Sequence, residues 1–317
     1  MLDILSITGP IYLTIAIGYA TTRAGWFRAD DMRVLGRFVI QLALPALLFN
    51  ALSQRPWGEI FHGRYLLAYA LASLVVVALG FAWARWRQGR SMSLSSVLAM
   101  GMACPNSGFV GYPVALLTLG APVAGVALAL NMVVENLLII PLLLALADMD
   151  GPQGRRWTVV LKQTLMGLVR NPMIIGIVLG MAASLLGWRL PEAGARTVQL
   201  FAQASGALSL FVIGGSLVGL GANQTAWTQV WQVGAGKLLL HPLAMLAVLA
   251  WVVPMDDPAL RTALVLTTAM PMMGIYTILA QRHGHQALSS AALVVTTVTS
   301  FFTLSGLLWL LQLVQWL

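Results

Sequence analysis

The chain has 317 residues, of which 59% are hydrophobic and only 9% are charged. A soluble domain of this length has about a quarter charged residues, so this composition excludes a soluble globular protein. The net charge of +8 is compatible with nucleic-acid binding, but the basic residues lie in short loops where they orient a membrane protein, and we expect no nucleic-acid partner. The single cysteine, Cys104, excludes an internal disulfide and a cysteine-based metal cluster.

Apolar stretches of about 20 residues recur along the chain, and each is long enough to cross the hydrocarbon core of a bilayer. The sequence therefore predicts an all-α polytopic membrane protein with ten transmembrane helices. Because no basic segment precedes the first apolar stretch, we expect that stretch to be retained rather than cleaved. The predicted spans are residues 5–22, 34–52, 64–86, 93–119, 122–147, 165–187, 198–221, 228–253, 259–281 and 287–315.

Lysine and arginine residues are distributed unevenly between the two sets of loops. The odd-numbered loops and their flanks carry Arg23, Arg28, Arg33, Arg37, Arg85, Arg87, Arg90, Arg155, Arg156, Lys162, Arg170 and Arg282. The even-numbered loops carry only Arg55, Arg64, Arg189, Arg196 and Arg261. Because loops rich in lysine and arginine stay in the cytoplasm, we expect the odd-numbered loops to be cytoplasmic and both termini to lie outside.

Two of the predicted spans contain the same A-x-P-x-x-G pattern, at Ala103–Gly108 and at Ala269–Gly274. Proline lacks a backbone N–H and clashes with the preceding turn, so the pattern predicts an interruption in the fourth and the ninth span. Non-helical backbone at membrane depth is tolerated only where it is buried in protein or lines a cavity. Paired interruptions in the two halves of a chain are typical of the substrate site of a secondary transporter.

The two halves of the chain also resemble each other in sequence. The identical pairs are Pro10 and Pro172, Ile15 and Ile177, Gly18 and Gly180, Ala20 and Ala182, Gly25 and Gly187, and Trp26 and Trp188. Each half has five predicted spans, an odd number, so the second half would be inserted upside down. The pattern predicts a 5+5 inverted repeat of residues 1–150 and 151–317. The alternative is chance similarity among apolar helices.

With these features the chain resembles the auxin efflux carrier family, whose bacterial members include malonate- and malate-type carriers. The segments that carry the resemblance are Cys104–Pro113, Ala269–Gly274, Ala43–Phe49, and Lys237-Leu238 followed by Pro242. The resemblance implies a secondary carrier of organic anions in a bacterial inner membrane. It implies the fold of bile-acid sodium symporters, with spans four and nine crossing at their breaks in a transport domain of spans three to five and eight to ten. Spans one, two, six and seven would form a scaffold that commonly dimerises.

The crossing of two broken helices would bring two half-helix N-termini together. Each N-terminus is equivalent to about half a positive charge, so the pair would balance one carboxylate. Asn106 and Ser107 follow the first break and can donate hydrogen bonds to a carboxylate, whereas the alternative is that they only cap a kinked helix. The predicted substrate-binding residues are Pro105, Asn106, Ser107, Gly108, Pro271, Met272, Met273, Tyr276, Asn50 and Asn131.

Ionisable residues inside a membrane are functional candidates by default. Glu135 lies in the fifth predicted span, and Lys237 and His241 lie one turn apart in the eighth. One hypothesis pairs Glu135 with Lys237 and uses the pair, or His241, to couple transport to protons. The alternative is a structural ion pair between the two spans. We expect no metal site and no cofactor, apart from a coupling proton or sodium ion.

The sequence thus predicts a homodimeric secondary transporter of a small organic anion, a mono- or dicarboxylate, that works by alternating access. An elevator-type movement follows from fold analogy alone. One alternative is a cation-coupled symporter of a bulkier organic acid, which the lack of acidic residues at the breaks weakens. Another is a membrane sensor that binds a ligand without translocating it. The motifs of intramembrane hydrolysis are missing from the sequence, and we expect no enzyme activity.

Overall fold

The computed structural model of the chain describes residues 2–150, 166–167, 169–219, 227–274, 276–281 and 283–314. Among the described residues the regular secondary structure is helical, and strand pairing is limited to an isolated bridge. Six of the described helices are long and apolar enough to cross a membrane, and two shorter apolar helices accompany them. Arg155, Arg156, Lys162 and Arg282, which support the predicted orientation, lie outside the described residues.

Most of the connections that the structure describes in full are short. The first half of the chain contains α1 (Leu2–Arg23), α2 (Ala29–Phe38), α3 (Leu44–Ser53), α4 (Gly63–Ala82), α5 (Met92–Ala103), α6 (Tyr112–Val134) and α7 (Ile140–Ala147). The second half contains α9 (Pro172–Leu186), α10 (Glu192–Ser216), α11 (Trp227–Ala235), α12 (His241–Trp251), α13 (Pro258–Ala269), α14 (Tyr276–Gln281) and α15 (Gln286–Leu313). Gly120 divides α6 into two helices because its φ is +81°, and it lies between the predicted spans 93–119 and 122–147.

Several helices contain a wider π-helical turn, and four of these turns are followed two residues later by a proline. The turns are η1 (Val39–Ala43) before Pro45, η4 (Ser107–Gly111) before Pro113, η5 (Glu135–Ile139) before Pro141 and η7 (Gly236–Leu240) before Pro242. A proline inside a helix removes one donor and its ring clashes with the preceding turn, and the wider turn accommodates both effects. Such turns are frequent at functional sites, and two of them contain Glu135 and Lys237.

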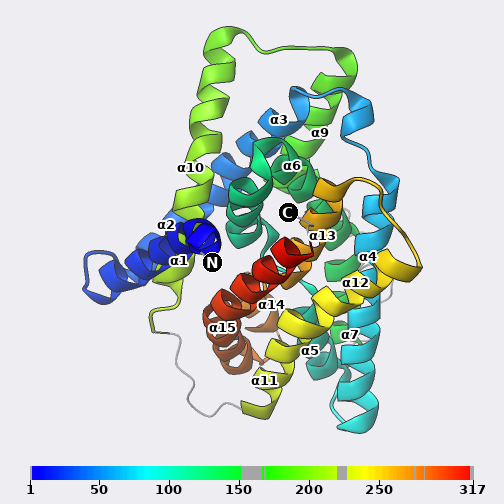
Figure 1. The fold of residues 1–317 in the computed structure, drawn as a ribbon. Coiled ribbons are helices and arrows are strands. Elements are labelled where there is room, and N and C mark those ends of the chain that lie inside the picture. Colours follow the sequence, from blue (N-terminus) through cyan, green and yellow to red (C-terminus); the bar gives the residue numbers. More distant parts are fainter. Residues whose placement is uncertain are drawn as a thin grey trace.

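The helices fall into two groups that meet along α6 and α13. Helices α1, α2, α3, α9 and α10 pack together at the left and top of Figure 1. Small residues permit this packing, since Gly176 of α9 lies so close to α3 that an added Cβ would be 2.7 Å from the carbonyl oxygen of Pro45. Helices α4, α5, α7, α11 and α12 form the second group at the lower right, with α15 against α11 (Figure 1).

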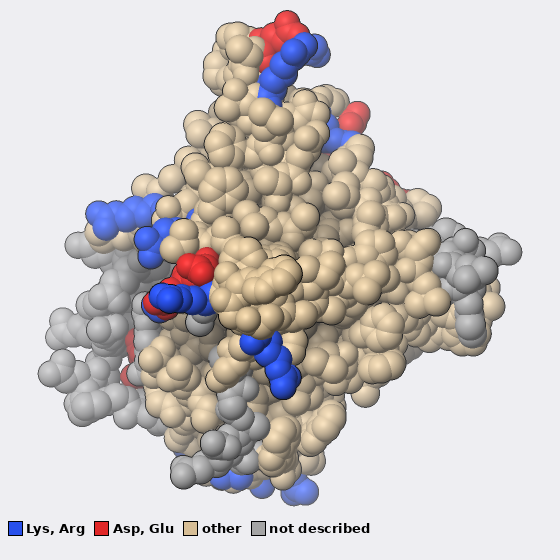
Figure 2. All heavy atoms as spheres, turned by 90° about the vertical axis from the view of Figure 1, so that its left-hand side faces the viewer, with Lys and Arg blue, Asp and Glu red and all other residues tan. Residues whose placement is uncertain are grey.

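The outer surface has the character expected for contact with lipid. On the face shown in Figure 2, the charged side chains of the described residues occur in small groups, separated by wide uncharged areas. Large hydrophobic side chains such as Leu13, Leu79 and Trp251 are exposed. Surface apolar residues in such numbers are typical of a protein whose solvent is the bilayer.

Candidate functional site

The two A-x-P-x-x-G segments lie against each other in the structure. Helix α5 ends at Ala103 and the π turn η4 begins at Ser107, whereas α13 ends at Ala269 and α14 begins at Tyr276. Pro105 and Met272 form an isolated antiparallel bridge. The N–H of Asn106 donates to the carbonyl of Pro271 over 2.8 Å, and the N–H of Met273 donates to that of Cys104 over 3.1 Å. These bonds satisfy backbone groups that the interrupted helices leave without partners.

Free hydrogen-bond donors remain at the beginning of η4. The side-chain oxygen of Asn106 accepts from the N–H of Phe109 over 3.1 Å, so Asn106 caps η4. Its amide Nδ2 and the N–H groups of Ser107 and Gly108 have no acceptor among the described residues. Because Asn106 is only 5% exposed, these donors are largely shielded from solvent. The arrangement suits an anion at a helix N-terminus.

The beginning of η4 faces the first group of helices. A Cβ added to Gly108 would lie 3.1 Å from Leu44 of α3. On the other side, Ser209 of α10 donates its hydroxyl to the carbonyl of Phe109 over 3.1 Å. The crossing therefore lies where the two helix groups meet.

Ser107 points away from these helices, into the second group. Its hydroxyl donates to Glu135 Oε1 over 2.5 Å. The hydroxyl of Tyr69 donates to the same oxygen over 2.7 Å. The predicted role of the Ser107 hydroxyl as a ligand of the substrate therefore differs from the geometry, because that hydroxyl already binds Glu135. What Ser107 offers to an anion is its backbone N–H.

Three polar residues on one face of α4 begin a buried network beneath the crossing. Tyr65, Tyr69 and Ser73 are spaced four residues apart and are all fully buried. Tyr65 donates to Asn131 over 2.9 Å, and Asn131 in turn donates to Thr267 over 3.0 Å. We call the network the polar ladder; its members are Tyr65, Asn131, Thr267, Tyr69, Glu135, Ser107, Ser73, His241, Lys237 and Thr268. It ties α4 to both interrupted helices.

Lys237 forms the last rung of the polar ladder. Its Nζ donates to the carbonyl of Thr268 over 2.6 Å and lies 2.9 Å from His241 Nδ1. With the ammonium donating to Nδ1, the ring proton of His241 lies on Nε2, which is 3.2 Å from Ser73 Oγ. Thr268 belongs to the last turn of α13, the negative end of that helix, so the ammonium neutralises a helix dipole.

Glu135 and Lys237, which one hypothesis paired, form no direct ion pair in the structure. Ion pairs within 4 Å among the described residues do not include this one. Both residues are fully buried or nearly so, at 3% and 0% exposure. Each charge is instead held at the end of an interrupted helix, Glu135 through Ser107 at the positive end of η4 and Lys237 at the negative end of α13.

A family model described as "Membrane transport protein" matches residues 7–308 of the chain. The protein belongs to this family of membrane transporters. The predicted resemblance to the auxin efflux carriers is thereby confirmed, and the protein is an integral membrane transporter rather than an enzyme.

Curated relatives cover much of this transporter. A "Putative malonate transporter" of Rhizobium meliloti is 28% identical over 312 residues, which are 98% of this chain and 97% of that protein. The "Uncharacterized transporter YfdV" of Escherichia coli is 28% identical over 245 residues, 75% of this chain and 76% of its own. An "Uncharacterized transporter" of Methanothermobacter thermautotrophicus is 25% identical over 189 residues, 56% of this chain and 60% of its own.

Three other residues predicted to bind the substrate form hydrogen bonds within the protein instead. The hydroxyl of Tyr276, predicted as a donor to the substrate, donates to the carbonyl of Val97 over 2.9 Å and joins α14 to α5. Asn131 uses both ends of its amide within the polar ladder. Asn50 is half-buried on α3 and accepts from Gln54 over 2.6 Å, which does not connect it with the crossing. Pro105, Pro271, Met272 and Met273 are buried at the crossing itself.

The sequence interpretation missed half of the polar ladder, namely Tyr65, Tyr69, Ser73, Thr267 and Thr268. A signal for the first three was present, because polar residues four apart on an apolar helix share one face. Thr267 and Thr268 directly precede the second A-x-P-x-x-G segment. Thr267 and Thr268 were missed because their hydrogen-bond partners, Asn131 and Lys237, lie on other helices, and the sequence alone does not show which helices are neighbours.

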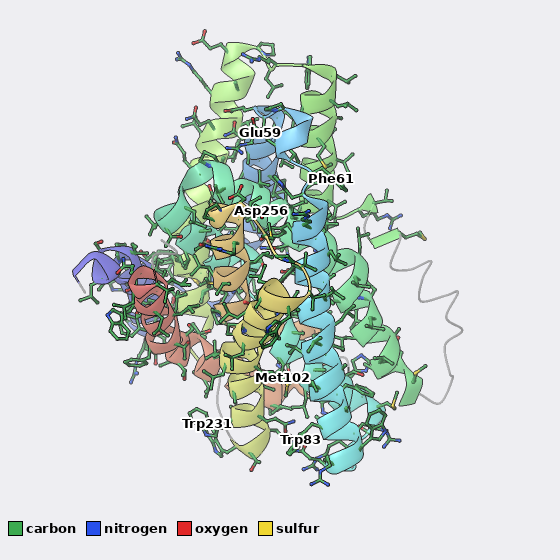
Figure 3. All side chains as sticks on the ribbon, turned by 45° about the vertical axis from the view of Figure 1, so that its right-hand side comes forward. Glu59, Phe61, Trp83, Met102, Trp231 and Asp256 are labelled. Atoms are coloured by element: carbon green, nitrogen blue, oxygen red, sulfur yellow. The ribbon has the colours of Figure 1, made fainter. Side chains whose placement is uncertain are left out.

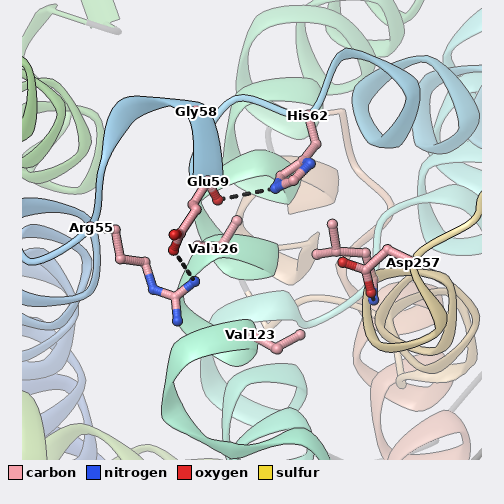
Figure 4. Close-up of a pocket in the computed structure, with 8 residues that line it drawn as sticks. Arg55, Gly58, Glu59, His62, Val123, Val126 and Asp257 are labelled. Atoms are coloured by element: carbon pink, nitrogen blue, oxygen red, sulfur yellow. Dashed lines mark hydrogen bonds and ion pairs between the residues drawn. The ribbon is translucent and has the colours of Figure 1, made fainter.

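Cavities of the transporter open at one end of the molecule. One of about 290 Å³ is lined by Arg55, Gly58, Glu59, His62, Val123, Val126, Asp257 and Leu260 (Figure 4). A neighbouring cavity of about 320 Å³ shares His62, Asp257 and Leu260. Figure 3 shows Glu59, Phe61 and Asp256 at this end, with Trp83 and Trp231 at the opposite end. Val126 and Leu260 lie on α6 and α13, the helices that carry Asn131 and Thr267 further along.

Two histidines in the turn before α15 connect that turn with neighbouring helices. His283 Nε2 lies 3.7 Å from Asp148 Oδ1, and His285 Nε2 lies 3.4 Å from Ser93 Oγ. Partial burial lowers the pKa of His285 below its ordinary value, and the nearby His283 lowers it further.

Proposed function

We propose that the protein is a secondary transporter of a small organic anion, whose carboxylate binds at the beginning of η4. The support is the set of free donors there: the N–H groups of Ser107 and Gly108 and the amide of Asn106. A helix N-terminus equivalent to about half a positive charge adds to their attraction for an anion. The printed name of the Rhizobium meliloti relative makes malonate the first dicarboxylate to test.

We further propose that transport proceeds by alternating access. In this proposal, α1–α3, α9 and α10 act as a scaffold and the remaining helices as a transport domain that carries the crossing along them. The contacts of Gly108 with α3 and of Phe109 with α10 support this boundary. The inverted repeat of residues 1–150 and 151–317, the elevator movement, the homodimer through the scaffold and the cytoplasmic odd-numbered loops belong to the same proposal and rest on sequence symmetry and fold analogy.

The position of Lys237 argues against the alternative of a sodium-coupled symporter. Carbonyl groups at the end of an interrupted helix are natural ligands of a cation. At the end of α13 that place is already taken by the ammonium of Lys237, which donates to Thr268. In this proposal the ammonium of Lys237 supplies the positive charge that a bound sodium ion would otherwise provide.

The test is counterflow in proteoliposomes with labelled malonate and a panel of mono- and dicarboxylates. We expect saturable exchange of one acid by the wild type. Asn106→Ala should slow that exchange about tenfold or more, because it removes a charge-assisted hydrogen bond of about 1.5–3 kcal/mol. The matched control is Gln203→Ala, which removes an exposed amide on α10.

Two outcomes would contradict the proposal. Undiminished exchange by Asn106→Ala would place the anion elsewhere and reduce Asn106 to a helix cap. A folded wild-type protein that exchanges none of the acids would exclude an organic-anion carrier of this class. A protein that binds an acid but never exchanges label would be a sensor.

A further inference from the structure

Glu135 is the buried carboxyl group of the transporter. Among the described residues it is the one aspartate or glutamate that is buried. Both of its hydrogen bonds, from Tyr69 and from Ser107, end on Oε1. Oε2 has no hydrogen-bond partner among the described residues. An ionised carboxylate inside a membrane protein is costly, and Oε2 is the oxygen of Glu135 that is left to take up a proton.

Ser107 links this carboxyl group with the proposed anion site. Its backbone N–H is one of the free donors at the beginning of η4, and its hydroxyl donates to Glu135. An anion bound at this N-terminus and an ionised Glu135 would be stabilised by the same helix end and would repel each other. Anion binding therefore favours a protonated Glu135, and by reciprocity a protonated Glu135 favours anion binding.

Several other ionisable groups lie around Glu135, and the positive charge of Lys237 among them favours its ionised form. Tyr65 and Tyr69 face it from α4, Cys104 from the interrupted segment, and Lys237 from η7. Lys237 makes no ion pair with Glu135 and is held by Thr268 and His241. Its positive charge thus remains stabilised by the end of α13 when Glu135 becomes neutral.

We propose that Glu135 binds one proton at Oε2 when the anion binds at the beginning of η4, so that proton and anion cross the membrane together. This inference rests on the proposed function. For a monocarboxylate the charge of the site is then unchanged by loading. For a dicarboxylate such as malonate, the proton removes one of the two added charges.

The experiment uses the full chain in proteoliposomes with labelled malonate, or with the acid of the panel that exchanges best, and with the membrane potential clamped to zero. A proton gradient of about one pH unit, acid outside, should drive about tenfold accumulation if one proton accompanies each anion. Glu135→Gln should lose this accumulation, and its counterflow in the same vesicles shows how much transport activity remains. The control Glu192→Gln, an exposed glutamate paired with Arg196 on α10, should accumulate the acid like the wild type.

A second variant covers a failure of Glu135→Gln to fold. Ser107→Ala keeps the backbone N–H but removes one donor to the ionised carboxylate, so the pH of half-maximal counterflow should rise. Gradient-driven accumulation by Glu135→Gln, or an unchanged pH profile in Ser107→Ala, would overturn the coupling role. If the wild type exchanges the acid without responding to the gradient, the coupling is wrong and the proposed function survives. If the wild type exchanges none of the acids, the proposed function itself fails.

Discussion

Ser107 and Glu135 are separated by 28 positions in the chain but joined by a hydrogen bond of 2.5 Å between Oγ and Oε1. The bond connects the beginning of η4 with the π turn η5. Because a lost hydrogen bond to a buried charge costs about 1.5–3 kcal/mol, the two turns are held in one relative position. A carboxyl group that can change its charge is thereby fixed one residue from the free donors of the crossing.

Removing the other donor to this carboxylate should alter the pH dependence of transport. Tyr69→Phe withdraws a hydrogen bond from the ionised form of Glu135, so the protonated form is favoured at higher pH. We expect the pH of half-maximal counterflow to rise by about one unit. Tyr65→Phe is the matched control, because it removes the same group one turn earlier, where the partner is the neutral Asn131. Equal shifts in both variants would refute a specific role of Tyr69.

Loss of the Lys237 ammonium should destabilise the protein. Lys237→Met leaves the carbonyl of Thr268 and Nδ1 of His241 without their donor. We expect a loss of about 2–4 kcal/mol in unfolding free energy, because two buried acceptors become unsatisfied. Cys104 is the sole cysteine and is buried, so a thiol-reactive dye reports unfolding on heating. An unchanged melting temperature would show that water or another group replaces the ammonium.

The contact between α1 and α10 should tolerate no side chain at Gly214. An added Cβ would overlap the carbonyl oxygen of Ile15, whereas one added to Gly206 on the same helix meets no atom within 4 Å. We expect Gly214→Ala to separate the helices and lower the yield of monodisperse protein in size-exclusion chromatography. Gly206→Ala should behave like the wild type. A normal elution profile for Gly214→Ala would mean that α1 and α10 pack differently.

Acid should weaken the folded state through His285. Burial lowers the pKa of His285 in the folded protein, so the unfolded chain binds more protons between that pKa and the ordinary value of about 6.5. Stability therefore falls as the pH drops through this window. His285→Gln should reduce the difference in melting temperature between neutral and mildly acidic buffer. A difference as large as that of the wild type would assign the acid sensitivity to another group.

Local chemistry made much of this protein predictable from its sequence. Long apolar stretches identified a membrane protein because a bilayer demands them. Pro105 and Pro271 marked the interruptions, since a proline disrupts a helix wherever it stands. The segments around them also carried the family resemblance that the match over residues 7–308 confirmed.

The partners of the buried polar groups were decided by the tertiary structure alone. In a span that is apolar on all sides, the sequence does not tell which face meets a neighbour, because hydrophobic periodicity is missing. Glu135 therefore seemed a partner for Lys237, but the rotation of α4 and η4 brings Tyr69 and Ser107 to it instead. In the same way Tyr276 reaches the carbonyl of Val97 rather than the crossing. The sequence determines that these polar groups need partners, and only the packing of the helices selects them.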